Sequence, residues 1–307
     1  MNKISFVIPC YNSEHTIKQV VEEIVDTVKN LYDFEIILVN DGSKDNVINV
    51  ISEMARINKS IKVIDLVKNF GQHAALLTGL RYVGGDIAVC LDDDGQTPPS
   101  ECLKLIDDIV LNDRDVVYAR YNAKHHTAFR NFGSKINDLM ACIMLEKPKE
   151  LYLSSYFACK RIIVDEIVRY TNSYPYMAGL ILRSTNKIGN VDINHRSRAV
   201  GTSGYTFGKL LSLWLNGFTA FSIKPLRAAS ILGFMISMFG FIYGIVLIIK
   251  KITNQVAVLG YSSLMAMMLF MGGLIMLILG LIGEYLGRIY LCINNQPQAV
   301  IRNTINI

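Results

Sequence analysis

Three consecutive carboxylates, Asp92, Asp93 and Asp94, follow a short apolar run of the chain, and Gln96 comes two residues later. Adjacent carboxylates repel one another, so their joint ionisation requires a nearby cation. Carboxylate and amide oxygens suit Mg²⁺ or Mn²⁺, which proteins commonly hold through one or two carboxylates together with substrate phosphates. The cluster therefore indicates a site for a divalent cation and a phosphate. A solvated acidic turn that only ends a strand is the alternative.

The elements around this cluster favour the first interpretation. Apolar runs rich in Val and Ile alternate with amphipathic stretches over the first 120 residues. The expected strands are Ile4–Ile8, Glu35–Val39, Ile61–Leu66, Asp86–Leu91 and Asp115–Ala119. The expected helices are Thr16–Leu31, Asp45–Ile57, Gln72–Val83 and Pro98–Leu111. This order predicts an α/β fold with a mostly parallel sheet covered on both faces. Ligands of such sheets bind beyond the carboxyl ends of the strands, where both Asp41 and the aspartate cluster fall.

Other phosphate-binding and metal-binding patterns fail in this sequence. No G-x-G-x-x-G follows the first strand, and residues 204–209 are one residue short of a P-loop and lack its closing Ser or Thr. His125 and His126 have no partners at metal-ligand spacing, and the other histidines are expected to be structural.

Charge is distributed unevenly along the 307 residues, although the net charge is only +5. Residues 1–115 carry 19 acidic and 11 basic residues, whereas residues 116–227 carry 6 acidic and 16 basic ones. An acidic half suits a metal, and a basic half suits phosphates or an anionic membrane surface. The alternative explanation of this uneven charge is that both sets of charged residues only face solvent.

The last 80 residues hold only five charges and read as a membrane hairpin. Residues 228–250 and 262–287 are predicted transmembrane helices, joined by an extracytoplasmic loop at 251–261, because each is long enough to cross about 30 Å of hydrocarbon. A buried hairpin in a soluble core is the alternative. Residues 205–227 are predicted to be an amphipathic juxtamembrane segment, and residues 130–145 have a similar pattern.

No signal peptide is recognisable at the N-terminus, so residues 1–204 are expected to be a cytoplasmic domain and residues 288–307 a cytoplasmic tail. The weak excess of basic residues at the cytoplasmic ends of the hairpin agrees with this inner-membrane, multi-pass arrangement. The six cysteines form no C-x-x-C pair and suggest reduced thiols.

Several motifs in order along the chain resemble those of family 2 glycosyltransferases with the GT-A fold. They are Val7-Ile-Pro-Cys-Tyr-Asn12, Val39-Asn-Asp-Gly-Ser43 and Asp92-Asp-Asp-Gly-Gln-Thr-Pro-Pro99. Three further segments resemble the polyprenyl-phosphate glycosyltransferase branch, which includes relatives of dolichyl-phosphate mannose synthase with a C-terminal membrane hairpin. They are Arg198–Tyr205, Phe221–Arg227 and Ile282–Arg288.

The resemblance implies a GT-A, Rossmann-like catalytic domain that moves one sugar from a UDP- or GDP-sugar to undecaprenyl or dolichyl phosphate, with inversion at the anomeric centre. The implied partners are this donor, this acceptor and the lipid bilayer, with Mg²⁺ or Mn²⁺ as cofactor and no nucleic acid. A homo-oligomer is possible under the same resemblance.

The resemblance also implies roles for individual residues. Nucleobase and ribose would contact Pro9, Tyr11, Glu14 and Asp41. Asp92 and Asp93 would line the nucleotide, and Asp94 and Gln96 would approach the metal. The acceptor phosphate would contact Arg130, Ser134 and Arg198. Asp94, Arg130 and Arg198 would be the catalytic residues.

The sequence departs from the family pattern at two places. Gly204 stands where the family commonly has Lys, which leaves more of the cationic role to Arg198. The segment from Tyr290 to Pro297 lacks the charged residues that usually follow the second helix. The Gly204 departure leaves one alternative open, a catalytically silent membrane scaffold for export of lipid-linked sugars. A polysaccharide synthase is a second alternative. The second is disfavoured because Trp214, the single Trp, is not part of a Q-x-x-R-W motif.

Overall fold

The computed structural model describes residues 3–121, 142, 147–172, 175–194, 260–293 and 297–307, together with scattered residues between 226 and 253. The chain divides into two compact units. One comprises Met1–Gly217 and Asn295–Ile307, and the other comprises Phe218–Asn294. The predicted amphipathic segments at 130–145 and 205–227 lie almost entirely outside the described residues.

One eight-stranded mixed sheet forms the centre of the first unit, in the order β7-β5-β6-β4-β1-β2-β3-β8. The strands are β1 (Lys3–Cys10), β2 (Asp33–Asn40), β3 (Ile61–Leu66), β4 (Ile87–Cys90), β5 (Val116–Tyr121), β6 (Phe157–Lys160), β7 (Ile188–Ile193) and β8 (Ile301–Ile305). Strands β6 and β8 pair antiparallel with their neighbours, and all other pairs are parallel. The expected α/β fold with a mostly parallel sheet is confirmed.

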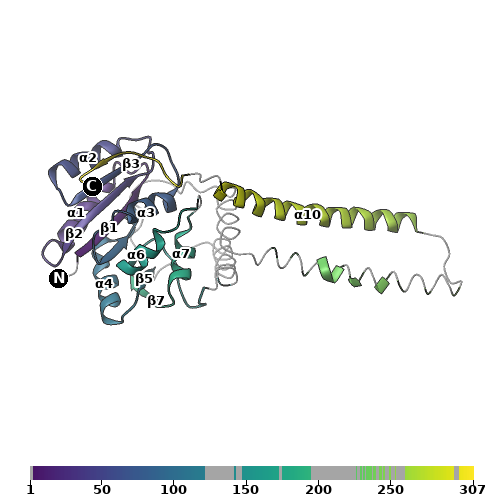
Figure 1. Cartoon of the computed structure of the whole chain (residues 1–307). Helices are drawn as coiled ribbons and strands as arrows, with labels where there is room; N and C mark the ends of the chain where they lie inside the picture. Colours follow the sequence, from purple (N-terminus) through teal and green to yellow (C-terminus); the bar gives the residue numbers. More distant parts are fainter. Residues whose placement is uncertain are drawn as a thin grey trace. The chain divides into compact units, whose positions relative to one another are not determined.

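Helices cover both faces of this sheet (Figure 1). They are α1 (Ile17–Val28), α2 (Val47–Ile57), α3 (Gln72–Leu80), α4 (Cys102–Leu111, preceded by the 3₁₀ turn η1, Pro99–Glu101), α6 (Arg161–Ile167) and α7 (Met177–Ser184). One face packs against α1, α2 and α4 in a single apolar core. On the other face α3 approaches β1 and β2 closely: a Cβ on Gly79 would lie 2.5 Å from Val7 Cγ1. Burial on both faces explains why the central strands are continuous apolar runs.

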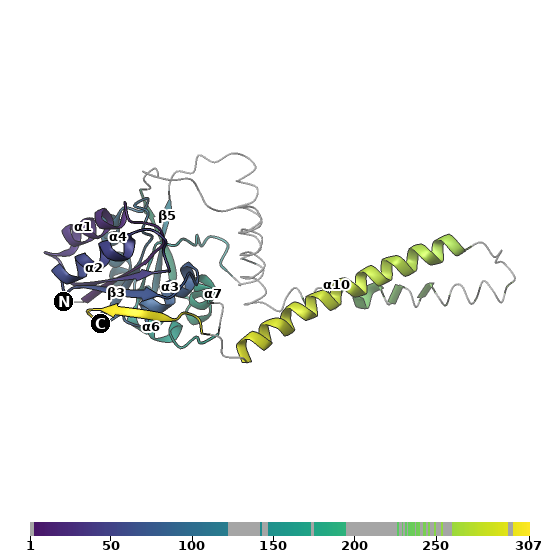
Figure 2. The ribbon, with the colours of Figure 1, turned by 90° about the horizontal axis from the view of Figure 1, so that it is seen from above.

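The C-terminal tail adds an edge strand that the sequence did not indicate. Strand β8 pairs antiparallel with β3, with Ile64 opposite Thr304 and Val63 opposite Ile305. Figure 2 shows this yellow strand running along the side of the domain next to β3. The end of the chain therefore belongs to the same sheet as its beginning.

The second unit contains the long helix α10 (Tyr261–Ile293). Its segment Phe270–Gly287 is apolar enough to cross a membrane, with a mean hydropathy of 1.8, and no part of it is buried within the protein. Helix α10 includes the predicted span 262–287 and continues six residues further. Of the predicted span 228–250, the structure describes scattered helical residues, and a Cβ on Gly233 would lie 3.9 Å from Ile278 Cδ1 of α10.

A buried carboxylate, Glu35, joins three segments at the amino-terminal edge of the sheet. It accepts hydrogen bonds from Ser5 Oγ at 2.7 Å and from the Gly84 amide at 2.6 Å. It also pairs with Lys3 at 2.9 Å and Lys62 at 3.0 Å. Burial raises the pKa of Glu35, but these hydrogen bonds outweigh burial and lower its pKa to about 2.

Replacing Glu35 by Gln is expected to lower the free energy of unfolding by about 2 kcal/mol at neutral pH, because two lysines and a hydroxyl lose their anionic partner. The folded pKa lies below the unfolded one, so this contribution is complete above the unfolded pKa of about 4.3 and is lost as pH falls towards 2. Thermal unfolding of the full chain at pH 7 and pH 3 measures the difference. Glu53→Gln, at an exposed position of α2, is the control, and an equal loss in both variants would contradict the prediction.

Candidate active site

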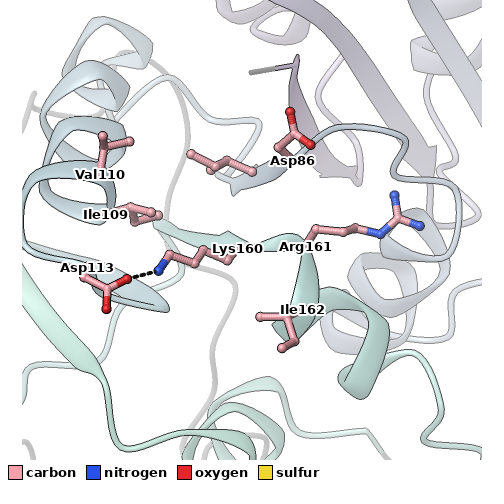
Figure 3. A pocket seen from close by; sticks show the side chains of 8 residues that line it. Asp86, Ile109, Val110, Asp113, Lys160, Arg161 and Ile162 are labelled. Carbon is pink, nitrogen blue, oxygen red and sulfur yellow. Dashed lines mark hydrogen bonds and ion pairs between the residues drawn. The ribbon is translucent and has the colours of Figure 1, made fainter. Parts of the chain in front are cut away.

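In the described part of the chain, hollows open at opposite edges of the sheet. The first, about 360 Å³, lies at the amino end of β4 (Figure 3). Its basic side chains are neutralised by acidic neighbours: Lys160 pairs with Asp113 at 2.6 Å, and Arg161 pairs with Asp165 at 2.6 Å. Paired charges leave little electrostatic attraction for a ligand, so this hollow is not the candidate site.

The second hollow, about 450 Å³, lies at the carboxyl edge, where parallel α/β sheets bind ligands. It is lined by Pro9, Cys10, Tyr11, Asp41, Asn69, Gly71, Gln72, Asp92, Asp93, Asp94 and Ser155. Four of these residues are acidic and none is basic, among the described residues that line it. The site therefore presents a concentration of negative charge to whatever enters it.

The carboxylate of Asp41, at the end of β2, holds the loop that follows β3. Its two oxygens accept the amide protons of Phe70 at 2.7 Å and Gly71 at 3.0 Å. Burial raises the pKa of Asp41, and these two hydrogen bonds oppose that effect. Asp41 thus fixes the backbone of a segment that itself lines the pocket.

Two neighbouring loops are joined by reciprocal hydrogen bonds. The Asn12 amide donates to Ser43 Oγ at 3.1 Å, and Asn12 Oδ1 accepts from the Lys44 amide at 2.9 Å. The carboxylate of Glu14 accepts from the Asn46 amide at 2.9 Å, just before α2 begins. In this structure Glu14 connects the two loops and does not line the pocket, in contrast to Pro9, Tyr11 and Asp41.

Asp93 anchors the loop between β1 and α1. Its carboxylate accepts the Tyr11 amide proton at 2.9 Å, and its carbonyl accepts a hydrogen bond from Thr16 Oγ1 at 2.7 Å. Burial is the main reason why the pKa of Asp93 is raised. The aspartate cluster and the first loop are therefore positioned together.

Asp92 is held between two neutral donors. Gln72 Nε2, at the start of α3, donates to one oxygen at 2.7 Å, and Ser155 Oγ, shortly before β6, donates to the other. The pKa of Asp92 is raised to about 6, mainly by burial. The Ser155 and Gln72 hydrogen bonds lower this pKa, whereas the negative charges of Asp94 and Asp93 raise it. Neither Gln72 nor Ser155 was predicted as a site residue. Their contacts depend on helix and strand placement that no local pattern indicates.

The donor set fits a divalent cation that shares its ligands with a substrate. No group of three or more His, Cys, Asp or Glu side chains forms a metal site within the described parts of the chain. Asp94 and three further carboxylates do line one pocket, and the mutual repulsion of the adjacent Asp92, Asp93 and Asp94 favours a cation there. One or two carboxylates completed by phosphate oxygens are a typical Mg²⁺ arrangement. Gln96 does not line the pocket; its amide donates to Asp94 Oδ1 at 3.0 Å.

The structure thus brings together six of the predicted site residues: Pro9, Tyr11, Asp41, Asp92, Asp93 and Asp94. Three others, Arg130, Ser134 and Arg198, lie outside the described residues. The predicted chemical roles of these residues stay predictions.

The fold and the pocket define an α/β protein with a ligand site at the carboxyl edge, and comparison with known proteins identifies its class. Residues 5–167 match the model of the family described as Glycosyl transferase family 2, and residues 224–289 match the one described as GtrB C-terminal hairpin. The chain belongs to glycosyl transferase family 2.

Relatives align along nearly the whole chain. The protein YkcC of Bacillus subtilis (strain 168), named an uncharacterized glycosyltransferase, is 33% identical to this chain. The alignment covers 99% of this chain and 94% of YkcC. An undecaprenyl-phosphate 4-deoxy-4-formamido-L-arabinose transferase of Proteus mirabilis (strain HI4320) is 31% identical. That alignment covers 100% of this chain and 95% of the relative.

The fold has counterparts among solved structures. Glucosyl-3-phosphoglycerate synthase of Mycobacterium tuberculosis, in complex with Mn²⁺, UDP-glucose and phosphoglyceric acid, superposes with a TM-score of 0.54. The two chains are 20% identical over 69% of this chain and 76% of the other. This similarity supports the GT-A fold.

Replacing Gly42 by Ala is expected to disrupt the packing of two pocket loops. Gly42 has φ +62°, and a Cβ there would lie 2.3 Å from the Lys68 carbonyl carbon and 2.5 Å from the Asn69 amide nitrogen. We expect a loss of about 2 kcal/mol or more in unfolding free energy, measured by thermal unfolding. Gly95→Ala is the matched control, because its φ is +69° but its Cβ would meet nothing nearer than 4.0 Å. An equal loss in both variants would show that backbone strain alone is responsible.

Replacing Asp92 by Asn is expected to stabilise the ligand-free protein by about 1 kcal/mol at pH 8 and by less at pH 5. The folded pKa of about 6 lies above the unfolded one, so the wild type loses stability as pH rises through 6, when a negative charge forms on this half-buried side chain. Thermal unfolding from pH 5 to pH 8, with divalent ions chelated, measures this. Asp107→Asn, at an exposed position of α4, is the control. The same pH dependence in wild type and Asp92→Asn would contradict the prediction.

Proposed function

We propose that this glycosyltransferase moves a single sugar from a nucleotide sugar to a polyprenyl phosphate at a membrane, as its Proteus relative's name indicates for that protein. The observation that carries the proposal is the acidic pocket at the carboxyl edge, in a chain that also matches a membrane-hairpin model. Such a pocket suits a nucleoside diphosphate accompanied by a cation, and the hairpin suits an acceptor dissolved in lipid.

In this proposal the loops after β1, β2 and β3 bind the nucleoside part of a UDP- or GDP-sugar. Tyr11 and Asp41 line the pocket and stand on loops fixed by hydrogen bonds to Asp93 and Phe70. Asp92 and Asp93 lie nearer the diphosphate. A loop held from both sides before the ligand arrives loses less conformational entropy on binding, which favours affinity.

Asp94 is the proposed carboxylate ligand of Mg²⁺ or Mn²⁺, and Gln96 supports the turn that presents it. The Mycobacterium enzyme with the same fold contains Mn²⁺ together with UDP-glucose. A bound divalent cation would neutralise the charge that develops on the departing diphosphate.

The acceptor side of the reaction is assigned to the basic part of the sequence. Arg130, Ser134 and Arg198 are proposed to bind the acceptor phosphate, and the two arginines to stabilise the departing diphosphate as well. A lipid phosphate is already anionic at neutral pH, so positioning and charge stabilisation can carry the reaction without a strong general base. Direct attack of that phosphate on the anomeric carbon inverts its configuration.

We place the catalytic domain, residues 1–204, and the tail, residues 288–307, on the cytoplasmic side of the cell membrane. Residues 228–250 and 262–287 would cross the membrane, with 251–261 outside and 205–227 at the inner surface. The match to a hairpin model and the candidate span in α10 support this topology. A homo-oligomer is compatible with it.

Asp94→Asn is expected to lower the rate of sugar transfer at least about 100-fold, because the proposed cation loses its carboxylate ligand. The assay combines full-length protein in detergent with polyprenyl phosphate, Mn²⁺ and each of a panel of UDP- and GDP-sugars. It measures the amount of glycolipid product. Asp26→Asn, which changes an exposed carboxylate of α1, is the matched control and should retain wild-type activity. A folded wild-type protein that makes no glycolipid from any donor would favour the silent scaffold.

A further inference from the structure

The C-terminal tail, residues 297–307, is bound to the catalytic domain by buried polar contacts. The side chain of Gln298 is buried, and both ends of its amide are paired. Its Nε2 donates to the carbonyls of Tyr170 at 2.9 Å and Asn172 at 2.6 Å, and its Oε1 accepts from Arg81 Nη2 at 2.6 Å. A fully paired buried amide accepts one geometry only, so Gln298 fixes where the tail begins.

The next tail residues bind the residue that follows β3. The Val67 amide donates to the Val300 carbonyl at 3.0 Å, and Arg302 Nη2 donates to the Val67 carbonyl at 3.0 Å. The pairing of β3 with β8 is irregular at this point, between Asp65 and Leu66. Irregularities of this kind redirect a strand and often occur beside functional sites.

Val67 is the first residue of the loop 67–71, which forms one side of the pocket. Asn69 and Gly71 line the pocket, and the amides of Phe70 and Gly71 donate to Asp41. Only Lys68 separates the residue bound by the tail from the first residue that lines the pocket. The tail and Asp41 therefore hold the two ends of one short loop.

The far end of the tail provides an anchor of a different kind. Asn306 Nδ2 donates to the carbonyls of Ala55 at 2.6 Å and Ile61 at 2.8 Å, and Lys59 Nζ donates to Asn306 Oδ1 at 3.1 Å. These partners lie around the amino end of β3, away from the pocket. Asn306 attaches the tail to the domain without touching the loop 67–71.

Burial of apolar surface does not account for the tail. Four of the five residues of β8 are exposed, so this strand adds little to the core. Its contacts are mainly backbone pairing and polar side chains aimed at the ends of β3. The hydrogen bonds between the tail and Val67 therefore need an explanation other than stabilisation of the fold by apolar burial.

We propose that the tail sets the conformation of the loop 67–71, which makes Gln298 and Arg302 positioning residues for the nucleotide. The part of this inference that concerns the nucleotide rests on the proposed function. Because the tail follows the membrane hairpin in sequence, its hydrogen bonds with Val67 also link the loop 67–71 to the membrane segment.

Hydrogen–deuterium exchange of the full chain in detergent tests the structural part directly. In Gln298→Ala and Arg302→Ala, the peptides that contain the amides of Phe70 and Gly71 should exchange about five-fold faster, as expected for the loss of one hydrogen bond. Asn306→Ala is the matched control: it removes three hydrogen bonds of the tail but should leave exchange in 67–71 unchanged. Arg302→Lys, which keeps a donor, should restore slow exchange in part.

Kinetics with the nucleotide sugar test the functional part. The two variants should raise the KM for the donor about five-fold while kcat stays within about two-fold, whereas Asn306→Ala should change neither. Unchanged exchange in both variants, or equal effects of Asn306→Ala, would overturn the inference and make β8 an ordinary edge strand. If the wild type transfers no sugar, the proposed function fails, and the exchange measurement still decides whether the tail positions the loop.

Discussion

The structure of the pocket depends on which groups balance the negative charge of the carboxylates at the carboxyl edge of the sheet. Asp41, Asp92 and Asp93 accept hydrogen bonds from backbone amides, an amide side chain and a hydroxyl, and no basic side chain lines the pocket among the described residues. Neutral donors hold these carboxylates in place without cancelling their charge. The edge is therefore rigid and negative at once, which is the combination that a cation-dependent phosphate site requires.

Glu35, at the opposite edge of the same sheet, shows how nearby lysines change the pKa of a carboxylate. Two lysines, a serine and a backbone amide surround it, and its pKa falls to about 2, whereas the pKa of Asp92 rises to about 6. The sheet thus carries carboxylates of two kinds, a buried one at its amino-terminal edge and a half-buried one in the pocket. Glu35 is neutralised by two lysines and stabilises the fold. Asp92 accepts hydrogen bonds from neutral donors only, and a carboxylate with a raised pKa in a pocket is typical of functional sites.

Sequence reasoning predicted the parts of this arrangement that follow from local patterns. The five strands from β1 to β5 are apolar runs, and parallel pairing brings Asp41 and Asp92–Asp94 to one edge because each ends such a run. The antiparallel strand β6 and the contribution of Ser155 were missed, since both depend on long-range pairing. Strand β8 was missed because Ile-Arg-Asn-Thr-Ile is short and mostly exposed, and it becomes a strand only beside β3. The bridging role of Glu14 likewise arises from contact with another loop.

Pairing of β8 with β3 also constrains the membrane topology that the hairpin can have. The catalytic unit contains residues from both sides of the segment 218–294, so the chain leaves this unit and returns to it. A folded sheet cannot be divided between the two sides of a bilayer, because its strands would lose their backbone partners in hydrocarbon. Any membrane passage between Gly217 and Asn295 must therefore consist of an even number of crossings. One crossing by α10 requires another in the preceding segment, which agrees with the predicted pair of spans.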